Sequence, residues 1–277
     1  MAYALAMNGA SKVFIIGRRE EHLRETAVSA IGGSIIPIVG DVTSRESLQA
    51  AYGSIASQTD HIDLLVANSG TTGRPLKSPE PRPDGSLPYF SELRDHLWSI
   101  SMEEFTNVSH VNVTGAFYTI LAFLPMLKAA NRKRSAPEQS TVSPPRPQII
   151  ITSSILGFSR FAPATENIAY HLSKAAVNHM VKLLATNLVQ DEIRVNGIAP
   201  GVYYTDMTLL FYESLGVKGK GIVDGSFSRD LIPITRSGGE EDIAGVILYM
   251  AGAAGGYLNG SIIVSDGGSL CVFPSTY

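Results

Sequence analysis

The chain is poor in cysteine and has little excess charge. Its single cysteine, Cys271, cannot form a disulfide within the chain and has no spaced partner for a metal site, so we expect no bound metal and a reducing, cytoplasmic setting. The 22 Lys and Arg residues nearly balance the 25 Asp and Glu residues. The chain therefore lacks the bulk charge that recruits nucleic acid or an anionic membrane surface, and small neutral partners are favoured.

The chain also lacks a long uninterrupted apolar run. Its most apolar stretch, residues 111–127, contains Asn112, Thr114 and Pro125 and is shorter than the roughly 20 apolar residues that a membrane-spanning helix needs. It is predicted as a buried helix. The first seven residues are too few for a secretory signal and are predicted as a helix that stops at Gly9. No repeat of fixed period is visible, which excludes solenoids and propellers.

What the chain does contain is an alternation of short β-branched runs with helical patterns. Strands are predicted at residues 13–16, 35–39, 62–66, 149–151, 193–198 and 262–264. Helices are predicted between most of them, at about residues 20–31, 44–59, 101–130, 167–190 and 240–253. Ser101 followed by Glu104 predicts a capping box at the start of the longest helix. This order predicts an α/β fold with a doubly wound parallel sheet, Rossmann-like, in a single domain spanning residues 1–277.

Two segments interrupt the alternation. Residues 71–88 contain five prolines, which remove backbone donors and exclude a helix or a central strand. Residues 131–147 begin with Arg132-Lys133-Arg134 and continue as proline-rich sequence. For this basic run a solvated loop is favoured over a nucleic-acid contact. Both segments are predicted as surface insertions.

The strongest chemical signal is the pair Tyr170 and Lys174, four residues apart on a predicted helix. Residues at this spacing lie on one helix face. A phenol with an ordinary pKa of about 10 transfers protons poorly at neutral pH, but a neighbouring ammonium favours the phenolate and lowers that pKa. Taken alone, the pair is better explained by an ordinary amphipathic helix.

The segment upstream changes that interpretation. The predicted strand at residues 148–152 runs directly into Ser153 and Ser154. These hydroxyls therefore follow the carboxyl end of a strand, which is the edge where open α/β sheets bind ligands. Together, the strand, the serine pair and Tyr170-x-x-x-Lys174 resemble the active-site signature of the classical short-chain dehydrogenase/reductase family.

Other segments resemble the same family over almost the whole chain. They are Asn68-Ser69-Gly70, Val111-Asn112-Val113-Thr114-Gly115, residues 195–201, residues 241–245 and residues 260–268. The resemblance implies an oxidoreductase that transfers a hydride between a nicotinamide dinucleotide and a ketone or secondary alcohol, such as a secondary-metabolite carbonyl.

The resemblance also implies a role for each member of a catalytic tetrad. Tyr170 would exchange a proton with the substrate oxygen, and Ser154 would hydrogen-bond the same oxygen. Lys174 would lower the pKa of Tyr170 and hold the nicotinamide ribose, while Asn112 would support a water chain. Ser154 is preferred to Ser153 because family members with a serine pair use the second. The span from Ser154 to Tyr170 is longer than is usual in the family, around residues 158–167.

Cofactor choice is implied by Gly17-Arg18-Arg19, which follows the strand after which the family binds the adenosine ribose. An arginine there suits the extra phosphate of NADP, so Arg18 favours NADP(H), with a solvated arginine pair as the alternative. Asp41 and Val42 resemble the adenine-contacting element, although Asp41 is nearly as well explained as a helix N-cap. The other implied cofactor positions are Asn68, Gly70, Tyr170, Lys174, Pro200, Val202 and Thr205.

Family members begin with a strand and a Gly-rich turn that holds the pyrophosphate, and no such segment precedes the helix predicted at residues 1–8. In the doubly wound order this strand is central, so its loss would leave buried backbone groups unpaired. Three explanations stay open: a start upstream of Met1 or a missed exon, a decayed enzyme, or a catalytically impaired binding or assembly protein. The retained tetrad, together with Arg18 and Thr205, favours the first.

The resemblance further implies a substrate lid and an oligomer. Residues 203–229 resemble the family's mobile lid, and their apolar side chains indicate an uncharged, fairly large substrate. The helices predicted at residues 101–130 and 167–190 would pair across a two-fold axis. We therefore expect a homodimer or a homotetramer.

Overall fold

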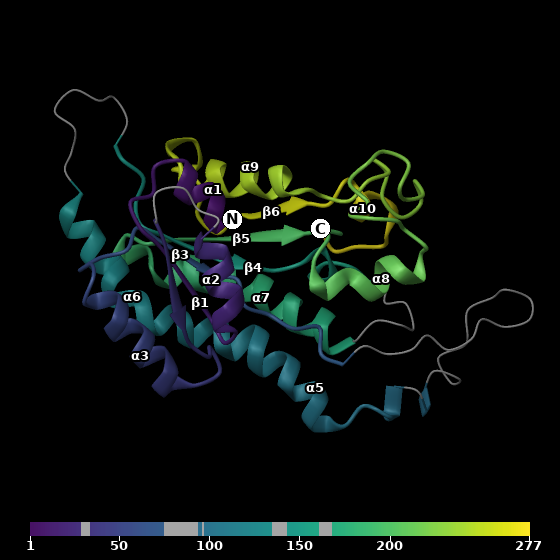
Figure 1. The fold of residues 1–277 in the computed structure, drawn as a ribbon, viewed down its shortest axis with the longest axis horizontal. Helices are drawn as coiled ribbons and strands as arrows, with labels where there is room; N and C mark the ends of the chain where they lie inside the picture. The colour runs from purple at the N-terminus through teal and green to yellow at the C-terminus, as the bar shows by residue number, and fades with distance from the viewer. Residues whose placement is uncertain (29–33, 75–93, 96, 135–142, 161–167) are drawn as a thin grey trace, which may run out of the picture.

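The computed structural model describes residues 1–28, 34–74, 94–95, 97–134, 143–160 and 168–277. Within these ranges, strands and helices alternate along the chain as predicted (Figure 1). The strands are β1 (Val13–Gly17), β2 (Ile35–Val39), β3 (Leu64–Ala67), β4 (Gln148–Thr152), β5 (Arg194–Pro200) and β6 (Ile262–Ser265). Each lies within a few residues of its predicted position.

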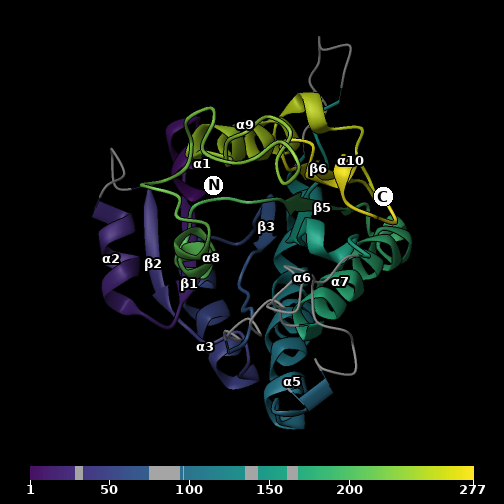
Figure 2. The same ribbon diagram turned by 90° about the vertical axis from the view of Figure 1, so that its right-hand side faces the viewer.

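The described strands form two parallel sheets. β1 pairs with β2, and the second sheet has the order β3-β4-β5-β6. Figure 2 shows the β1-β2 pair standing apart from the other four strands. The fold is the predicted Rossmann-like α/β arrangement. Among the described strands, β1 and β3 are not hydrogen-bonded to each other. The central strand was expected from the sequence to be absent at this position.

The second sheet is buried on both faces, and β4 shows how its sequence produces this. Ile149 and Ile151 pack against α6 (Ala116–Lys133) and α7 (Ile168–Asn187). Ile150, which points to the opposite face, packs against α1 (Ala2–Met7) and α9 (Glu240–Ala251). The two helix layers are visible in Figure 2. A continuous β-branched run is what a doubly covered strand requires, and burying each such side chain contributes about 1.5–3 kcal/mol.

Helix α6 holds the two sheets together. Phe123 and Met126 on α6 pack with α3 (Arg45–Ala56) against Phe14 and Ile16 of β1, whereas Ile120 and Leu127 face the second sheet. The helical stretch Met102–Lys133 is long and apolar enough to cross a membrane by length and composition alone. One face of it nevertheless packs in the core through Ile120, Phe123 and Leu127, as predicted for residues 111–127, whereas Met102, Tyr118 and Leu121 are exposed.

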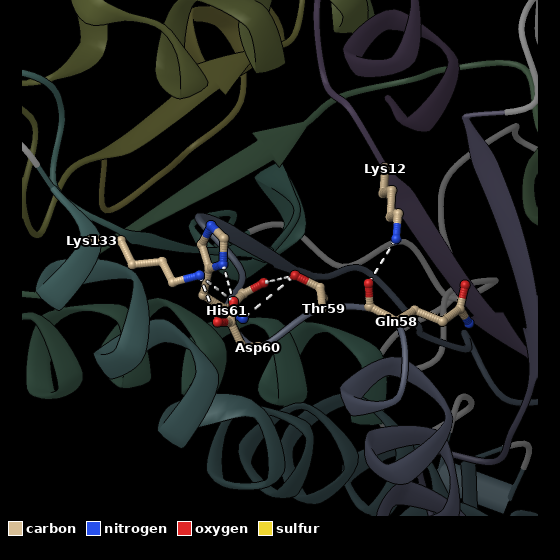
Figure 3. Close-up of polar contacts among 6 residues, drawn as sticks. All are labelled: Lys12, Gln58, Thr59, Asp60, His61 and Lys133. Atoms are coloured by element: carbon tan, nitrogen blue, oxygen red, sulfur yellow. Dashed lines mark hydrogen bonds and ion pairs between the residues drawn. The ribbon is translucent and has the colours of Figure 1, made fainter.

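Polar contacts add a second connection at the loop between α3 and β3 (Figure 3). Lys12, just before β1, donates to the backbone oxygen of Gln58 over 2.7 Å. The carboxylate of Asp60 accepts from Lys133 at the end of α6 over 2.6 Å and contacts the ring of His61 over 2.7 Å. The loop thus joins the β1 side of the molecule to α6.

The helix predicted at residues 101–130 is continuous from Met102 to Lys133, but it changes type along its length. It consists of α5 (Met102–Ser109), a π-helical turn (His110–Gly115) and α6. The predicted capping box is confirmed, with Ser101 and Glu104 accepting from each other's backbone amides. The first helix, α1, is also confirmed, and Gly9 follows it with a φ of +98°. π-turns often occur at functional sites, and this one contains Asn112.

The remaining elements follow the predicted order. They are α2 (Glu20–Val28), α8 (Leu209–Ser214), α10 (Ser269–Val272) and short 3-10 turns at Ile155–Gly157, Val189–Asp191, Asp206–Thr208 and Ala253–Gly255. Of the two predicted insertions, residues 75–88 and 135–142 lie outside the described residues. Helix α6 extends to Lys133, so the second insertion begins later than predicted.

Candidate functional site

The carboxyl ends of β3, β4 and β5 lie at one edge of the second sheet, and the residues predicted as catalytic lie there. β4 continues into Ser153 and Ser154, and α7 brings Tyr170 and Lys174 beside this strand end. Helix α7 begins at Ile168, so Tyr170 occupies its first turn and Lys174 its second. Residues 161–167, which carry most of the lengthened span before Tyr170, lie outside the described residues.

Lys174 is buried although it carries an ionisable group. Only 4% of the residue is exposed, and its Nζ donates to the backbone oxygen of Thr152 over 2.8 Å. The same nitrogen lies 5.6 Å from the centroid of the Tyr170 ring. Burial lowers the pKa of Lys174 to about 8, because desolvation disfavours the ammonium. The ammonium therefore lies close to the phenol, as the four-residue spacing predicts.

The two serines after β4 have different hydrogen bonds. Ser153 is directed inward, and its Oγ lies 2.5 Å from Asn178 Oδ1 and 3.2 Å from the backbone oxygen of Lys174. The Oγ of Ser154 accepts from the amide of Leu156 over 3.2 Å. Among the described residues, no acceptor is found for the Ser154 hydroxyl hydrogen. This arrangement supports the choice of Ser154 as the serine that contacts substrate.

Asn112 connects the π-turn to two other segments. Its Oδ1 accepts from the amide of Thr71 over 2.8 Å, and its Nδ2 donates to the Thr71 oxygen and to Ser173 Oγ, both over 2.9 Å. Ser173 in turn donates to the backbone oxygen of Tyr170 over 2.8 Å. Thr71 and Ser173 were not predicted as site residues. The only signal for Ser173 was its place between Tyr170 and Lys174.

Gly70 provides a test of whether the site can hold a nucleotide cofactor. A Cβ at this position would lie 3.2 Å from Asn112 Oδ1 and 3.6 Å from Lys174 Nζ. The glycine thus leaves room beside two polar groups at the sheet edge. Asn68, two residues earlier, accepts from Thr152 Oγ1 over 2.9 Å. The space that the glycine leaves beside the Lys174 ammonium fits a nucleotide cofactor at this sheet edge.

The residues expected near the adenosine half lie beyond β1 and β2. Arg18 follows β1 and is exposed. Asp41 accepts from the amide and hydroxyl of Thr43, which holds the pKa of this carboxyl below its usual value. The alternative that Asp41 is the helix N-cap is wrong, because Ser44 caps α3. Val42 packs on Gly115, where a Cβ would lie 3.1 Å from its side chain.

Beyond β5, the predicted cofactor residues lead into the lid segment. Pro200 ends β5, Val202 packs in a small apolar cluster, and Thr205 is exposed at the start of a 3-10 turn. One contact was not predicted: Arg19 lies 3.7 Å from Asp206, and both side chains are mostly exposed. This ion pair joins the segment after β1 to the lid segment.

Among the described strands, none lies between β1 and β3 in the order of the sheets. The described residues also contain no group of three or more His, Cys, Asp or Glu side chains placed to hold a metal ion.

The chain is similar to known proteins over nearly all of its length. A family model described as "Enoyl-(Acyl carrier protein) reductase" matches residues 1–269. The short-chain dehydrogenase/reductase PhomF' of Diaporthe leptostromiformis is 42% identical over 278 residues, covering 99% of this chain and 87% of that protein. The short-chain dehydrogenase/reductase SAT3 of Stachybotrys chartarum is 38% identical, and the match covers 100% of both chains.

Solved structures are also similar to this chain in fold and sequence. The RhlG/NADP active-site complex of Pseudomonas aeruginosa has a TM-score of 0.72 and 29% identity, covering 96% of this chain and 89% of that chain. A short-chain type dehydrogenase/reductase from Mycobacterium marinum has a TM-score of 0.72 and 28% identity, covering 98% and 89%. The chain belongs to the short-chain dehydrogenase/reductase family of oxidoreductases.

Proposed function

We propose that this chain is an NADP(H)-dependent carbonyl reductase, or alcohol dehydrogenase in the reverse direction, acting on a small-molecule ketone or secondary alcohol such as a secondary-metabolite carbonyl. One observation carries the proposal. The buried ammonium of Lys174 lies 5.6 Å from the ring centroid of Tyr170 and is held by the carboxyl end of the strand that bears Ser154. This arrangement supports proton transfer at a phenol near neutral pH.

In the reductive direction, the substrate carbonyl carbon receives a hydride and its oxygen receives a proton. A reduced nicotinamide, whose ribose Lys174 would hold, would supply the hydride. The hydroxyl of Tyr170 donates the proton, and the Ser154 hydroxyl donates a hydrogen bond to the same oxygen and orients it. The Lys174 ammonium stabilises the phenolate that Tyr170 becomes, since an adjacent opposite charge favours the ionised form. Asn112 fixes the segment of Thr71 beside this centre.

Several observations support NADP rather than NAD. Arg18 presents a guanidinium after β1, and this planar fork suits a phosphate. The similar structure from Pseudomonas aeruginosa is a complex with NADP. Tyr170 and Lys174 would contact the nicotinamide ribose, and Pro200, Val202 and Thr205 would lie beside the nicotinamide. Asn68 and Gly70 would lie beside the adenosine half of the cofactor, with Asp41 and Val42 at the adenine.

We also propose a cytoplasmic homodimer or homotetramer, with residues 203–229 as the substrate lid.

A second candidate function is a catalytically impaired protein that binds a partner or assembles with other chains. It is favoured by the division between the two sheets, since among the described strands β1 and β3 are not hydrogen-bonded to each other. The two candidates differ in one measurable property. The enzyme must bind NADPH, and the impaired protein need not.

The proposed function is tested by following NADPH oxidation with a panel of uncharged ketones, together with calorimetric titration of NADPH. We expect micromolar binding and turnover that Tyr170→Phe abolishes, because phenylalanine has no proton to donate. Full turnover by Tyr170→Phe would refute the role of the phenol. An absence of NADPH binding would favour the second candidate.

A further inference from the structure

The end of β4 holds Lys174 at two places. The backbone oxygen of Thr152 accepts from the side-chain nitrogen of Lys174 over 2.8 Å. One residue later, the Ser153 hydroxyl lies 3.2 Å from the backbone oxygen of the same lysine. Thr152 at the end of β4 therefore contacts the side chain of Lys174, and the next residue, Ser153, contacts its backbone.

Asn178, one turn further along α7, completes this contact. Its Oδ1 lies 2.5 Å from Ser153 Oγ. Because the hydroxyl has a single hydrogen, it donates chiefly to this nearer acceptor, and the Lys174 oxygen at 3.2 Å is the longer, secondary contact. Ser153 is 2% exposed and Asn178 is 9% exposed. Water therefore has little access to these groups, and buried polar groups that lose a partner are costly. Among the described residues no partner is found for Asn178 Nδ2, which leaves Oδ1 as its structural contact.

Gly157 shows how closely this part of the molecule is packed. It ends the 3-10 turn Ile155–Gly157, which follows Ser154. A Cβ at this position would lie 2.7 Å from the backbone carbon of Lys174 and 2.8 Å from Asn178 Nδ2. The turn after Ser154 therefore lies directly on the backbone of α7 at Lys174. At residue 157 the turn and the helix approach each other with no side chain between them.

We infer that Ser153 and Asn178 are positioning residues, forming a latch that fixes the backbone of α7 at Lys174 against the end of β4. The latch sets where Tyr170 and Lys174 lie relative to the Ser154 hydroxyl. Lysine has four rotatable side-chain bonds, so the hydrogen bond from its ammonium alone leaves the backbone free to shift. Fixing the backbone as well keeps the ammonium at a constant distance from the phenol. This inference rests on the proposed function and assigns a role to the serine that does not contact substrate.

The latch is tested with Ser153→Ala, Asn178→Ala and the double variant in the full chain. The control is Thr186→Ala, which removes a hydroxyl bonded to the backbone oxygen of Lys182 on the exposed side of the same helix. We expect each latch variant to lower kcat by roughly 10- to 100-fold, the range for a slightly misplaced catalytic group. We also expect the pH profile of kcat/KM to shift. Thr186→Ala should match the wild type within about twofold.

The double variant distinguishes a latch from two independent contacts. Because Ser153 and Asn178 act through one hydrogen bond, the double variant should lose little more activity than either single variant. If the two losses multiply, or if kcat and the pH profile are unchanged in Ser153→Ala, the inference is wrong. If Ser153→Ala does not fold, Asn178→Ala provides the same comparison.

A readout without turnover separates this inference from the proposed function. The rate of acetic anhydride modification at Lys174, followed by mass spectrometry over a pH series, reports the accessibility and ionisation of its amine. We expect modification to be faster in Ser153→Ala and unchanged in Thr186→Ala. If the wild type proves inactive towards ketones but this difference is found, the proposed function fails and the latch stands. An identical labelling profile in wild type and Ser153→Ala overturns the latch.

Discussion

The side-chain amide of Asn112 donates a 2.9 Å hydrogen bond to the hydroxyl of Ser173, although 61 residues separate them in the chain. The Ser173 hydroxyl in turn donates to the backbone oxygen of Tyr170. The π-turn between α5 and α6 is therefore tied to the first turn of α7. Because Asn112 also binds both backbone polar groups of Thr71, one buried side chain joins three segments at the sheet edge.

Burial of Lys174 predicts that the site reduces the stability of the fold. The pKa of Lys174 is lowered from 10.5 to about 8 by desolvation, so the unfolded chain holds its proton more tightly. The penalty is fully present below pH 8, decreases as pH rises, and is gone above pH 10.5. Lys174→Met should be inactive but more stable at pH 7, by up to about 3 kcal/mol at 1.36 kcal/mol per pKa unit.

The measurement is urea unfolding of Lys174→Met and wild type at pH 7 and pH 9. We expect the stability difference to be smaller at pH 9. The control is Lys182→Met on the same helix, whose ammonium is exposed and donates to the backbone oxygen of Gly260. A difference for Lys174→Met that is independent of pH would contradict the assigned cause.

Arg18 provides a prediction about cofactor choice. A guanidinium that pairs with the extra phosphate of NADP contributes about 1.5–3 kcal/mol through charge-assisted hydrogen bonds. Arg18→Gln should therefore reduce the preference for NADPH over NADH by roughly 10- to 100-fold in kcat/KM. Arg24→Gln is the matched control, because Arg24 pairs with Glu20 within α2. If Arg19→Gln alone removes the preference, the second arginine binds the phosphate.

Asp60 gives a prediction at acidic pH, outside the site. Its pKa is lowered to about 2, chiefly by the hydrogen bond from Lys133 and then by that from His61. Because this value is below the ordinary 3.8, the contribution of Asp60 to stability is present above pH 3.8 and is lost as pH falls through 2. NMR titration of Lys133→Met should move the Asp60 pKa towards 3.8. Lys128→Met, which removes a different ion pair, should not move it.

The sequence predicted local features of this structure well, because they depend on neighbouring residues. Apolar periodicity located β4 and its buried isoleucines, and the four-residue spacing of Tyr170 and Lys174 placed the ammonium beside the ring. The capping box at Ser101 is equally local, since both partners lie within one turn.

Features that depend on tertiary packing were missed. The π-turn at His110–Gly115 lies where Gly115 packs on Val42, a contact between segments far apart in the chain. The family resemblance favoured Ser154 over Ser153, but the contact of Ser153 with Asn178 was not predicted, because 25 residues separate the two in the chain. Likewise, nothing near Arg19 in the sequence indicates Asp206 as its partner.

Gly70 and Gly53 give opposite predictions for the same substitution. At Gly70 a Cβ would lie 3.2 Å from Asn112 Oδ1 and 3.6 Å from Lys174 Nζ, whereas at Gly53 in α3 it would meet nothing within 4 Å. Gly53→Ala should stabilise the fold by about 1 kcal/mol, because alanine is the better helix former, and should leave activity unchanged. Gly70→Ala should fold but raise KM for NADPH and lower kcat, because the methyl group occupies space beside the ammonium. Urea unfolding and steady-state kinetics of both variants check this contrast, and wild-type kinetics in Gly70→Ala would show that the space beside Lys174 is not used by the cofactor.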